Sequence, residues 1–136
     1  MFFKFMLTII VDAIIIRDNK VLLAQRSEKE DERGKWSFPG GVANKGESKK
    51  DALVRELREE LDIEIDNICL FKSYSIKNGK NKIKAFYYIC NFSEKLINLN
   101  EELSNYGWFS IDEKILDLDF SFNQKLVAQD LIKFLS

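Results

Sequence analysis

The pattern of apolar and polar positions predicts a chain of strands interrupted by two helices. Residues 7–16 form a β-branched apolar run, and residues 21–26 form a second run after a polar turn, which predicts a hairpin. Apolar and polar residues alternate over 63–76, and a turn at 77–81 leads into a returning strand over 82–92. The other predicted elements are a short strand over 106–110, a short helix or turn over 112–118 and a last helix over 123–135.

Two helical segments carry the spacing of helices that cover a sheet. Leu53, Leu57 and Leu61 recur at i, i+4 and i+8, which gives the first helix an apolar stripe to bury. The helix over 123–135 has apolar residues at similar spacing. Helices with hairpins between them predict an α/β fold, more closely an α+β arrangement with a mixed sheet between helices. A chain of 136 residues, 46% of them hydrophobic, is long enough for one domain over 1–136 and too short for two.

The first helix also carries an acidic face. Glu56, Glu59 and Glu60 fall at i, i+3 and i+4, so their carboxylates share one side of the helix. Like charges at this spacing raise the free energy of the helix unless cations compensate them. Hard oxygen donors suit Mg²⁺ or Mn²⁺. The alternative is a solvated helix face, which is the usual fate of a run of charges.

A glycine loop just before this helix favours the metal interpretation. Pro39 fixes a backbone angle and the pair Gly40 and Gly41 permits positive φ, so we expect a tight loop whose main chain approaches a ligand or ion closely. Either Glu47 or Ser48 is placed to cap the start of the helix. The unit is therefore a glycine loop that leads into an acidic helix.

At fixed spacing these residues resemble the signature of the Nudix hydrolases. The matching positions are Gly41, Glu47, Arg55, Glu56, Leu57, Glu59, Glu60 and Ile63. Asp62 departs from the signature because it stands where the family has its last glycine. Since Asp is among the few other residues that tolerate the left-handed conformation, we interpret this change as a weaker C-cap. The resemblance implies an α/β/α sandwich, and the segments 22–26 and 52–61 look most like its MutT and CTP-pyrophosphohydrolase branch.

The resemblance also implies roles for the site residues. The metal ligands would be the three helix glutamates and the carbonyl of Gly40, holding Mg²⁺ or, as a substitute, Mn²⁺. Arg55 would pair with Glu47 and hold the helix against the loop, and Gly41 would be structural. Glu102 looks like the additional loop glutamate of MutT-type members, a metal ligand or base, with Glu101 as its rival. Because the chain has no histidine, a carboxylate or the metal must manage the proton.

Three further residues resemble substrate-binding positions of the MutT-type enzymes. Arg26 would contact the nucleotide, and its alternative is an ordinary cation at a strand edge. Phe38 would line the base pocket or belong only to the core. Asn123 would read the base through its carboxamide, and the alternative, which we slightly prefer, is a helix N-cap.

The expected function is that of a Mg²⁺-dependent pyrophosphohydrolase. Its substrate would be a nucleoside diphosphate linked to another group, first of all an NTP or dNTP cleaved to the monophosphate and pyrophosphate, including oxidised forms such as 8-oxo-dGTP. Alternatives within enzymes are ADP-ribose, a nucleotide sugar or a dinucleoside polyphosphate. A nucleotide sensor without turnover is the alternative outside enzymes.

Composition restricts the partners. A net charge of −1 argues against holding polymeric nucleic acid, which needs a basic surface. Lys4 and Asp12 interrupt the apolar run over 1–16, so a buried strand explains it better than a membrane segment, and we expect no membrane partner. Cys69 and Cys90 lie in apolar strands, which predicts buried thiols in a reducing, cytoplasmic compartment. Monomer and homodimer both remain open.

Overall fold

A computed structural model describes residues 7–93 and 96–136, and its elements follow the predicted order. The elements are β1 (Leu7–Arg17), β2 (Lys20–Arg26), β3 (Trp36–Ser37), β4 (Gly40–Val42), α1 (Lys49–Leu61), β5 (Ile65–Asn78), β6 (Asn81–Phe92), β7 (Leu103–Ser110), the 3-10 helix η1 (Glu113–Asp117) and α2 (Gln124–Leu135). The short strands β3 and β4 were not predicted, because two or three residues carry no readable periodicity. Strand β7 begins three residues earlier than predicted because β2 pairs with it as far as Arg26 opposite Leu103.

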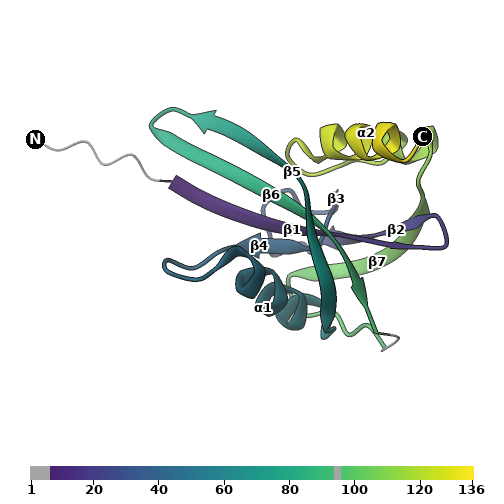
Figure 1. Ribbon diagram of the computed structural model, residues 1–136, viewed down its shortest axis with the longest axis horizontal. Coiled ribbons are helices and arrows are strands. Elements are labelled where there is room, and N and C mark those ends of the chain that lie inside the picture. The colour runs from purple at the N-terminus through teal and green to yellow at the C-terminus, as the bar shows by residue number, and fades with distance from the viewer. Residues whose placement is uncertain (1–6, 94–95) are drawn as a thin grey trace, which may run out of the picture.

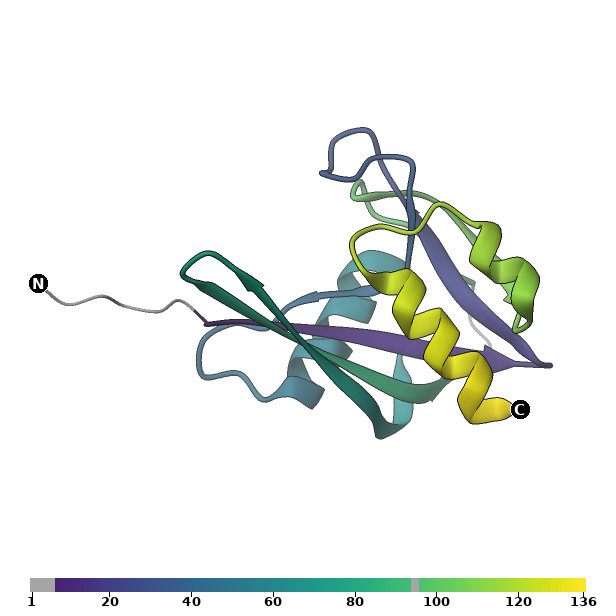
Figure 2. The same ribbon diagram turned by 90° about the horizontal axis from the view of Figure 1, so that it is seen from above.

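The strands form one mixed sheet of seven strands. Its main path runs β3-β2-β1-β6-β5, with β4 paired to β1 and β7 paired to β2. Strands β1 and β6 are parallel, and the other pairs are antiparallel. Figure 1 shows α1 below and α2 above this sheet. Figure 2 shows the molecule from above, with α2 lying across the sheet. The predicted mixed sheet between two helices is therefore confirmed.

Each helix covers one face of the sheet with its own apolar core. The predicted stripe Leu53, Leu57 and Leu61 of α1 is fully buried and packs against the face that includes Val11 and Ala13. On the opposite face, α2 buries Val127, Ala128 and Leu131. Within the described part of the chain, no helix has the length and apolar content needed to cross a membrane.

Helix α1 begins and ends at residues that the sequence indicates. Ser48 is the N-cap, because its hydroxyl oxygen accepts from the Asp51 N–H at 3.1 Å, which leaves Glu47 for another role. Asp62 adopts the left-handed conformation with φ 56° and ψ 41°, and its N–H closes the last turn on the carbonyls of Leu57 and Arg58. The interpretation of Asp62 as a C-cap in place of glycine is confirmed.

Asp62→Gly should raise the free energy of unfolding by a few tenths to about 1 kcal/mol, because glycine adopts the left-handed conformation without a Cβ penalty. The gain is limited by the loss of the hydrogen bond that Asn98 Nδ2 donates to Asp62 Oδ2 at 3.2 Å. Urea denaturation of both proteins measures the difference. A lower midpoint for the variant would mean that the Asp62 side chain contributes more than its backbone conformation costs.

The prediction of two buried thiols is wrong for one of them. Cys90 is buried on β6, whereas Cys69 is exposed on β5. Strand β5 is the edge of the sheet, and its register shifts on both sides of Cys69, between Asp66 and Cys69 and between Leu70 and Lys72. These bulges break the alternation from which burial was inferred, so Cys69 turns to solvent.

Candidate active site

The glycine loop is fixed by three neighbouring elements. Its three successive residues, 38–40, are each held by a hydrogen bond to a different part of the fold. Helices α1 and α2 and strand β1 thereby meet at this loop, although they lie far apart in the sequence. The three bonds run from the Phe38 N–H to Gln124 Oε1 (2.7 Å), from the Ala13 N–H to the Pro39 carbonyl (2.8 Å) and from the Gly40 N–H to Glu60 Oε1 (2.9 Å).

Both glycines of the loop lie in close contact with neighbouring groups. A Cβ at Gly40 would overlap the Val11 carbonyl and the Asp12 side chain, because β4 lies directly against β1 there. A Cβ at Gly41 would overlap the carboxylate of Glu56. The loop backbone therefore lies directly against the acidic face of α1, as the sequence predicts for a loop that approaches its ligand closely.

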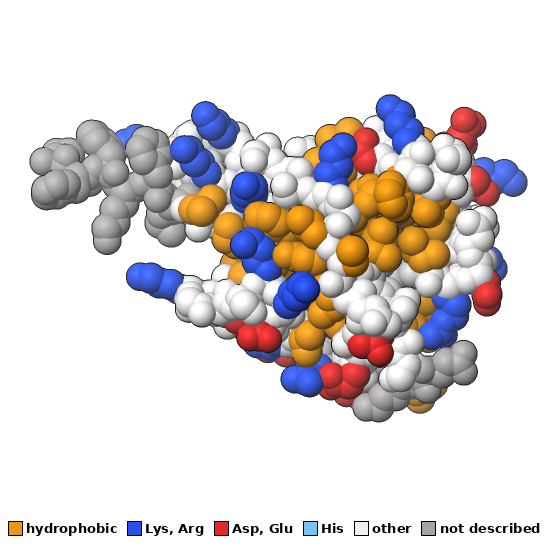
Figure 3. All heavy atoms as spheres, in the orientation of Figure 1, with side chains coloured by type: hydrophobic (Ala, Val, Ile, Leu, Met, Phe, Trp, Pro, Cys, Tyr) orange, Lys and Arg blue, Asp and Glu red, His pale blue; other side chains and the backbone are white. Residues whose placement is uncertain are grey.

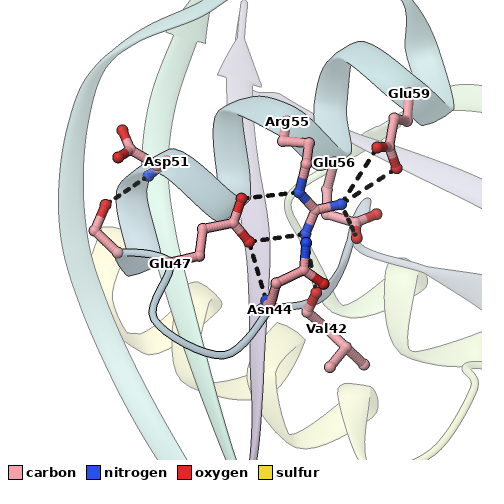
Figure 4. A network of polar contacts seen from close by, with 8 residues as sticks. Val42, Asn44, Glu47, Asp51, Arg55, Glu56 and Glu59 are labelled. Atoms are coloured by element: carbon pink, nitrogen blue, oxygen red, sulfur yellow. Dashed lines mark hydrogen bonds and ion pairs between the residues drawn. The ribbon is translucent and has the colours of Figure 1, made fainter.

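Arg55 connects the helix to the loop that precedes it (Figure 4). Its guanidinium donates to both carboxylate oxygens of Glu47, at 2.9 and 3.0 Å, and to the Val42 carbonyl at 3.1 Å. The same group donates to Glu56 at 3.0 Å and to Glu59 at 3.3 Å. The Arg55 guanidinium lowers the pKa of Glu47 below its usual value. The expected pairing of Arg55 with Glu47 is thus present, and one cation compensates three carboxylates.

The helix carboxylates differ strongly in their surroundings. Glu60 is only 6% exposed, and burial, reinforced by the nearby charge of Glu56, raises its pKa well above the usual value. The pKa of Glu56 is also raised, mainly by burial, although Arg55 acts in the opposite direction. We call the largely buried group formed by Glu56, Glu60 and the Gly40 backbone the recess. The Glu59 side chain is 54% exposed and lies outside it. The structure therefore brings Glu56, Glu60 and Gly40 together, with Glu59 at the margin.

The donors present fit a hard divalent cation. Glu56 and Glu60 are carboxylates whose charged forms are disfavoured by burial and by each other, and a cation between them would remove both penalties. Within residues 7–93 and 96–136, no three acidic, cysteine or histidine side chains are yet grouped in an arrangement that could hold a metal. Figure 4 shows that Arg55 engages both Glu56 and Glu59. Metal binding through all three glutamates would require these carboxylates to turn from Arg55.

The structure distinguishes between the two rival loop glutamates. The charge of Glu102 acts on the pKa of both Glu56 and Glu60, and burial raises the pKa of Glu102 itself. Glu101 instead pairs with Lys29 at 3.7 Å, and its side chain is 79% exposed. Glu102 is therefore the loop carboxylate whose charge reaches Glu56 and Glu60.

Arg26, the last residue of β2, lies close to the residue that precedes Asn123. The Arg26 guanidinium lies 5.6 Å from the ring centre of Phe122, the residue before Asn123. Asn123 occupies the N-cap position and is exposed, but its side chain makes no capping hydrogen bond. Asn123 is thus the N-cap residue, as we preferred, but its side chain does not supply the capping hydrogen bond. Its φ of −96° and ψ of 21° depart from the extended conformation in which a side-chain oxygen reaches the first-turn N–H groups.

Phe38 does not face a binding surface. Its side chain is 2% exposed and packs at right angles to Tyr87, with ring centres 5.7 Å apart, and parallel to Phe120 at 6.4 Å. The proposed contact of this ring with a base is not supported. The ring belongs to the core beneath α2, and the Phe38 N–H donates to Gln124 of that helix.

A buried polar network beneath the loop was missed by sequence reasoning. Asp12, Tyr87 and Gln124 are each less than a tenth exposed and hydrogen-bonded to one another. The Gln124 carboxamide donates to Asp12 at 3.3 Å while its oxygen accepts from the Phe38 N–H. A lone Asp in an apolar strand was a detectable signal, but nothing in the sequence showed that Gln124 would be buried beside it. Gln124 thus ties α2 to the glycine loop.

Asp12→Asn should stabilise the protein at alkaline but not at acidic pH. Burial is the main cause that raises the Asp12 pKa from 3.8 to about 8, so the unfolded chain ionises first and native stability falls as pH rises through this interval. Asparagine has no such ionisation, and we expect the variant to gain about 1–3 kcal/mol at pH 8 relative to pH 4. Denaturant titrations of both proteins across this range give the measurement. A difference that stays constant with pH would contradict the buried, protonated Asp12.

Comparison with known proteins agrees with this fold. The family model of the NUDIX domain matches residues 6–131. The CTP pyrophosphohydrolase of Escherichia coli is 58% identical over 55 residues, a match spanning 40% of this chain and 41% of that enzyme. The 8-oxo-dGTP diphosphatase of Buchnera aphidicola is 31% identical over 106 residues, covering 78% of this chain and 79% of that protein. The solution structure of the E. coli ORF135 protein superposes with a TM-score of 0.84 at 30% identity, covering 96% and 92% of the two chains. With its glycine loop and acidic helix in place, the chain belongs to the Nudix family.

Proposed function

We propose that the protein is a divalent-metal-dependent pyrophosphohydrolase that cleaves nucleoside triphosphates to the monophosphate and pyrophosphate. The observation that carries this proposal is the hydrogen bond from the Gly40 N–H to Glu60, which holds the glycine loop against the acidic helix. The names of the similar proteins, a CTP pyrophosphohydrolase and an 8-oxo-dGTP diphosphatase, support a nucleotide as the substrate class. Cytosine and oxidised guanine nucleotides are therefore the first substrates to test.

The proposed metal ligands are Glu56, Glu60 and the Gly40 carbonyl, with Glu59 joining once it leaves Arg55. Mg²⁺ is the proposed metal, with Mn²⁺ as a substitute. A bound divalent ion would neutralise phosphate charge and lower the pKa of its water. Arg55 holds the loop and helix in register, so the donors keep their relative positions when a ligand binds.

Further residues have proposed roles in proton transfer and substrate binding. Burial raises the pKa of Glu102, and this carboxylate would accept a proton from the attacking water. Arg26 would bind the phosphates or the sugar, and the exposed Asn123 would offer its carboxamide to the base. Phe38 contributes its backbone position, not its ring. In a chain without histidine, these are the groups that could bind substrate and manage its proton.

A substrate panel tests the proposed function. Purified protein is incubated with Mg²⁺, with Mn²⁺ or with EDTA, together with NTPs, oxidised dNTPs, ADP-ribose, nucleotide sugars and dinucleoside polyphosphates. We expect pyrophosphate and the monophosphate from an NTP or dNTP, and no turnover in EDTA. Phosphate instead of pyrophosphate would place the attack elsewhere. Binding of nucleotide without turnover under every metal condition would contradict an enzyme and favour a sensor.

Asn123→Ala should change the order of preference among bases more than the maximal rate. The exposed carboxamide makes no capping hydrogen bond to α2, so its removal costs little stability and deletes only contacts to a ligand. We expect the ratio of kcat/KM between the best and the next nucleotide to fall about ten-fold. Steady-state kinetics on CTP, GTP and 8-oxo-dGTP provide the test, and an unchanged order would remove Asn123 from base recognition.

A further inference from the structure

Helix α2 packs on the sheet mainly through apolar side chains. Its buried residues are Val127, Ala128 and Leu131, which belong to the core, and Gln124, which is polar. Figure 3 shows apolar side chains gathered on the visible face just below the place of α2 in Figure 1. The apolar contacts are therefore sufficient to hold the helix against the sheet. Because burial of a carboxamide costs free energy unless its polar atoms are hydrogen-bonded, the partners of Gln124 indicate what this side chain does.

Gln124 is connected to the glycine loop in two ways. Its Oε1 accepts a hydrogen bond from the Phe38 N–H at 2.7 Å. Its Nε2 donates to the Asp12 carboxyl at 3.3 Å, and that carboxyl packs so closely against Gly40 that a Cβ there would overlap it. One side chain of α2 thereby supports the loop on both sides of Pro39, directly at Phe38 and through Asp12 at Gly40.

The other contacts of the loop come from β1 and α1. The Pro39 carbonyl accepts from the Ala13 N–H at 2.8 Å, and the Gly40 N–H donates to Glu60 at 2.9 Å. The peptide group between Pro39 and Gly40 is thus held at both of its polar atoms. The Gly40 carbonyl, which is a proposed metal ligand, belongs to the next peptide group. Its position therefore depends on how the loop is held, and Gln124 is the contact that α2 provides.

The start of α2 is itself attached to the strand that leads into the loop. The Trp36 N–H donates to the Asp119 carbonyl at 2.8 Å, and the Ser121 N–H donates to the Trp36 carbonyl at 2.9 Å. Trp36 begins β3, two residues before Phe38. Together with the bond from Phe38 to Gln124, these contacts join the loop and the start of α2 into one connected unit.

We propose that Gln124 is a positioning residue for the reaction, which holds the Gly40 carbonyl where a divalent cation would bind. This inference rests on the proposed function, because it takes the Gly40 carbonyl as a metal ligand. Gln124 touches no reacting group and acts through the backbone of residues 38–40. Loss of a residue that orients a metal ligand commonly costs about 10–100-fold in metal affinity or activity. If Gln124 only satisfied polar groups in the core, its loss would lower stability alone.

Gln124→Met tests this role, because methionine has a similar length and cannot make either hydrogen bond of the carboxamide. At saturating Mg²⁺ we expect kcat for CTP to fall about 10–100-fold, with a change in KM below about three-fold. Without nucleotide, the dissociation constant of Mn²⁺, measured from the EPR signal of the free ion, should rise about ten-fold. The Phe38 amide should exchange faster with solvent in NMR spectra. Gln124→Asn keeps a carboxamide on a shorter side chain and should give an intermediate loss, which provides the same test if the methionine variant does not fold.

Two control variants separate positioning from stability. Val127→Ala removes buried atoms from the same helix and lowers stability without touching the loop. Gln129→Met makes the same substitution at an exposed position of α2. We expect both controls to keep the wild-type kcat and Mn²⁺ affinity.

The outcomes distinguish this inference from the proposed function. Wild-type kcat and Mn²⁺ affinity in Gln124→Met, or an equal loss in Val127→Ala, would show that Gln124 is only structural. A wild type that binds Mn²⁺ but hydrolyses no nucleotide would contradict the proposed function, and the Mn²⁺ affinity of the variants would still decide whether Gln124 positions the metal ligand. Absence of Mn²⁺ binding by the wild type would overturn both.

Discussion

Glu60→Gln should reduce hydrolysis at least about 1,000-fold while leaving the fold intact. The amide keeps an oxygen to accept the Gly40 N–H at its present 2.9 Å, so the loop retains its anchor. What is lost is the negative charge that a cation would need. Because burial raises the pKa of Glu60, its ionisation lowers native stability as pH rises above the usual glutamate value of 4.5. Without metal, the variant should therefore melt at a higher temperature than the wild type at pH 8.

Thermal melts without Mn²⁺ measure the predicted change in stability, and melts with Mn²⁺ measure the loss of metal binding. Mn²⁺ should raise the melting temperature of the wild type and leave that of Glu60→Gln almost unchanged, because the variant lacks a ligand. Glu101→Gln is the matched control, since that carboxylate is exposed on a nearby loop, where it forms an ion pair with Lys29. Wild-type turnover in Glu60→Gln, or an equal Mn²⁺ response, would remove Glu60 from the proposed metal site.

Gly41→Ala should separate activity from stability in a similar way. The new Cβ would occupy the place of the Glu56 carboxylate, which is the far end of a flexible side chain and can move aside at little cost to the fold. We expect about a 100-fold loss of kcat/KM, because displacement of a reacting group by about 1 Å has an effect of this size. The melting temperature without metal should change little.

Gly46→Ala provides the opposite pattern. Gly46 has φ +80° and open space around its Cβ position, so alanine there is strained but touches no carboxylate. We expect this variant to lose about 1 kcal/mol of stability and to keep its activity. If Gly41→Ala behaves like Gly46→Ala, the position of Glu56 does not control the reaction.

The candidate site was largely predictable because its parts are close in the sequence. Helical spacing alone placed Glu56, Glu59 and Glu60 on one face, and backbone preferences alone identified the turn at Pro39 and the left-handed Asp62. These are properties of local geometry, which a short segment carries with it. The pairing of Arg55 with Glu47 belongs to the same class, because eight residues of loop and helix connect them.

The errors lie where distant segments decide the environment. From its position in the sequence, Phe38 was expected to line the binding loop. Its ring is instead buried in the core beneath α2, which lies more than 80 residues away in the sequence. Cys69 reads as a buried strand residue, but its strand forms the edge of the sheet and contains bulges. The choice of Glu102 over Glu101 also required the fold, since neighbours in sequence point to different partners.

By itself, the sequence determined the helices, the hairpins, the glycine loop and the acidic face of the first helix, because hydrogen-bonding geometry and φ/ψ preference act over a few residues. Only the tertiary structure decided that Glu60 and Asp12 are buried and that Gln124 ties α2 to the loop. Burial and electrostatic potential depend on every atom nearby in space. A net charge of −1 does not tell where in the fold the charged side chains lie.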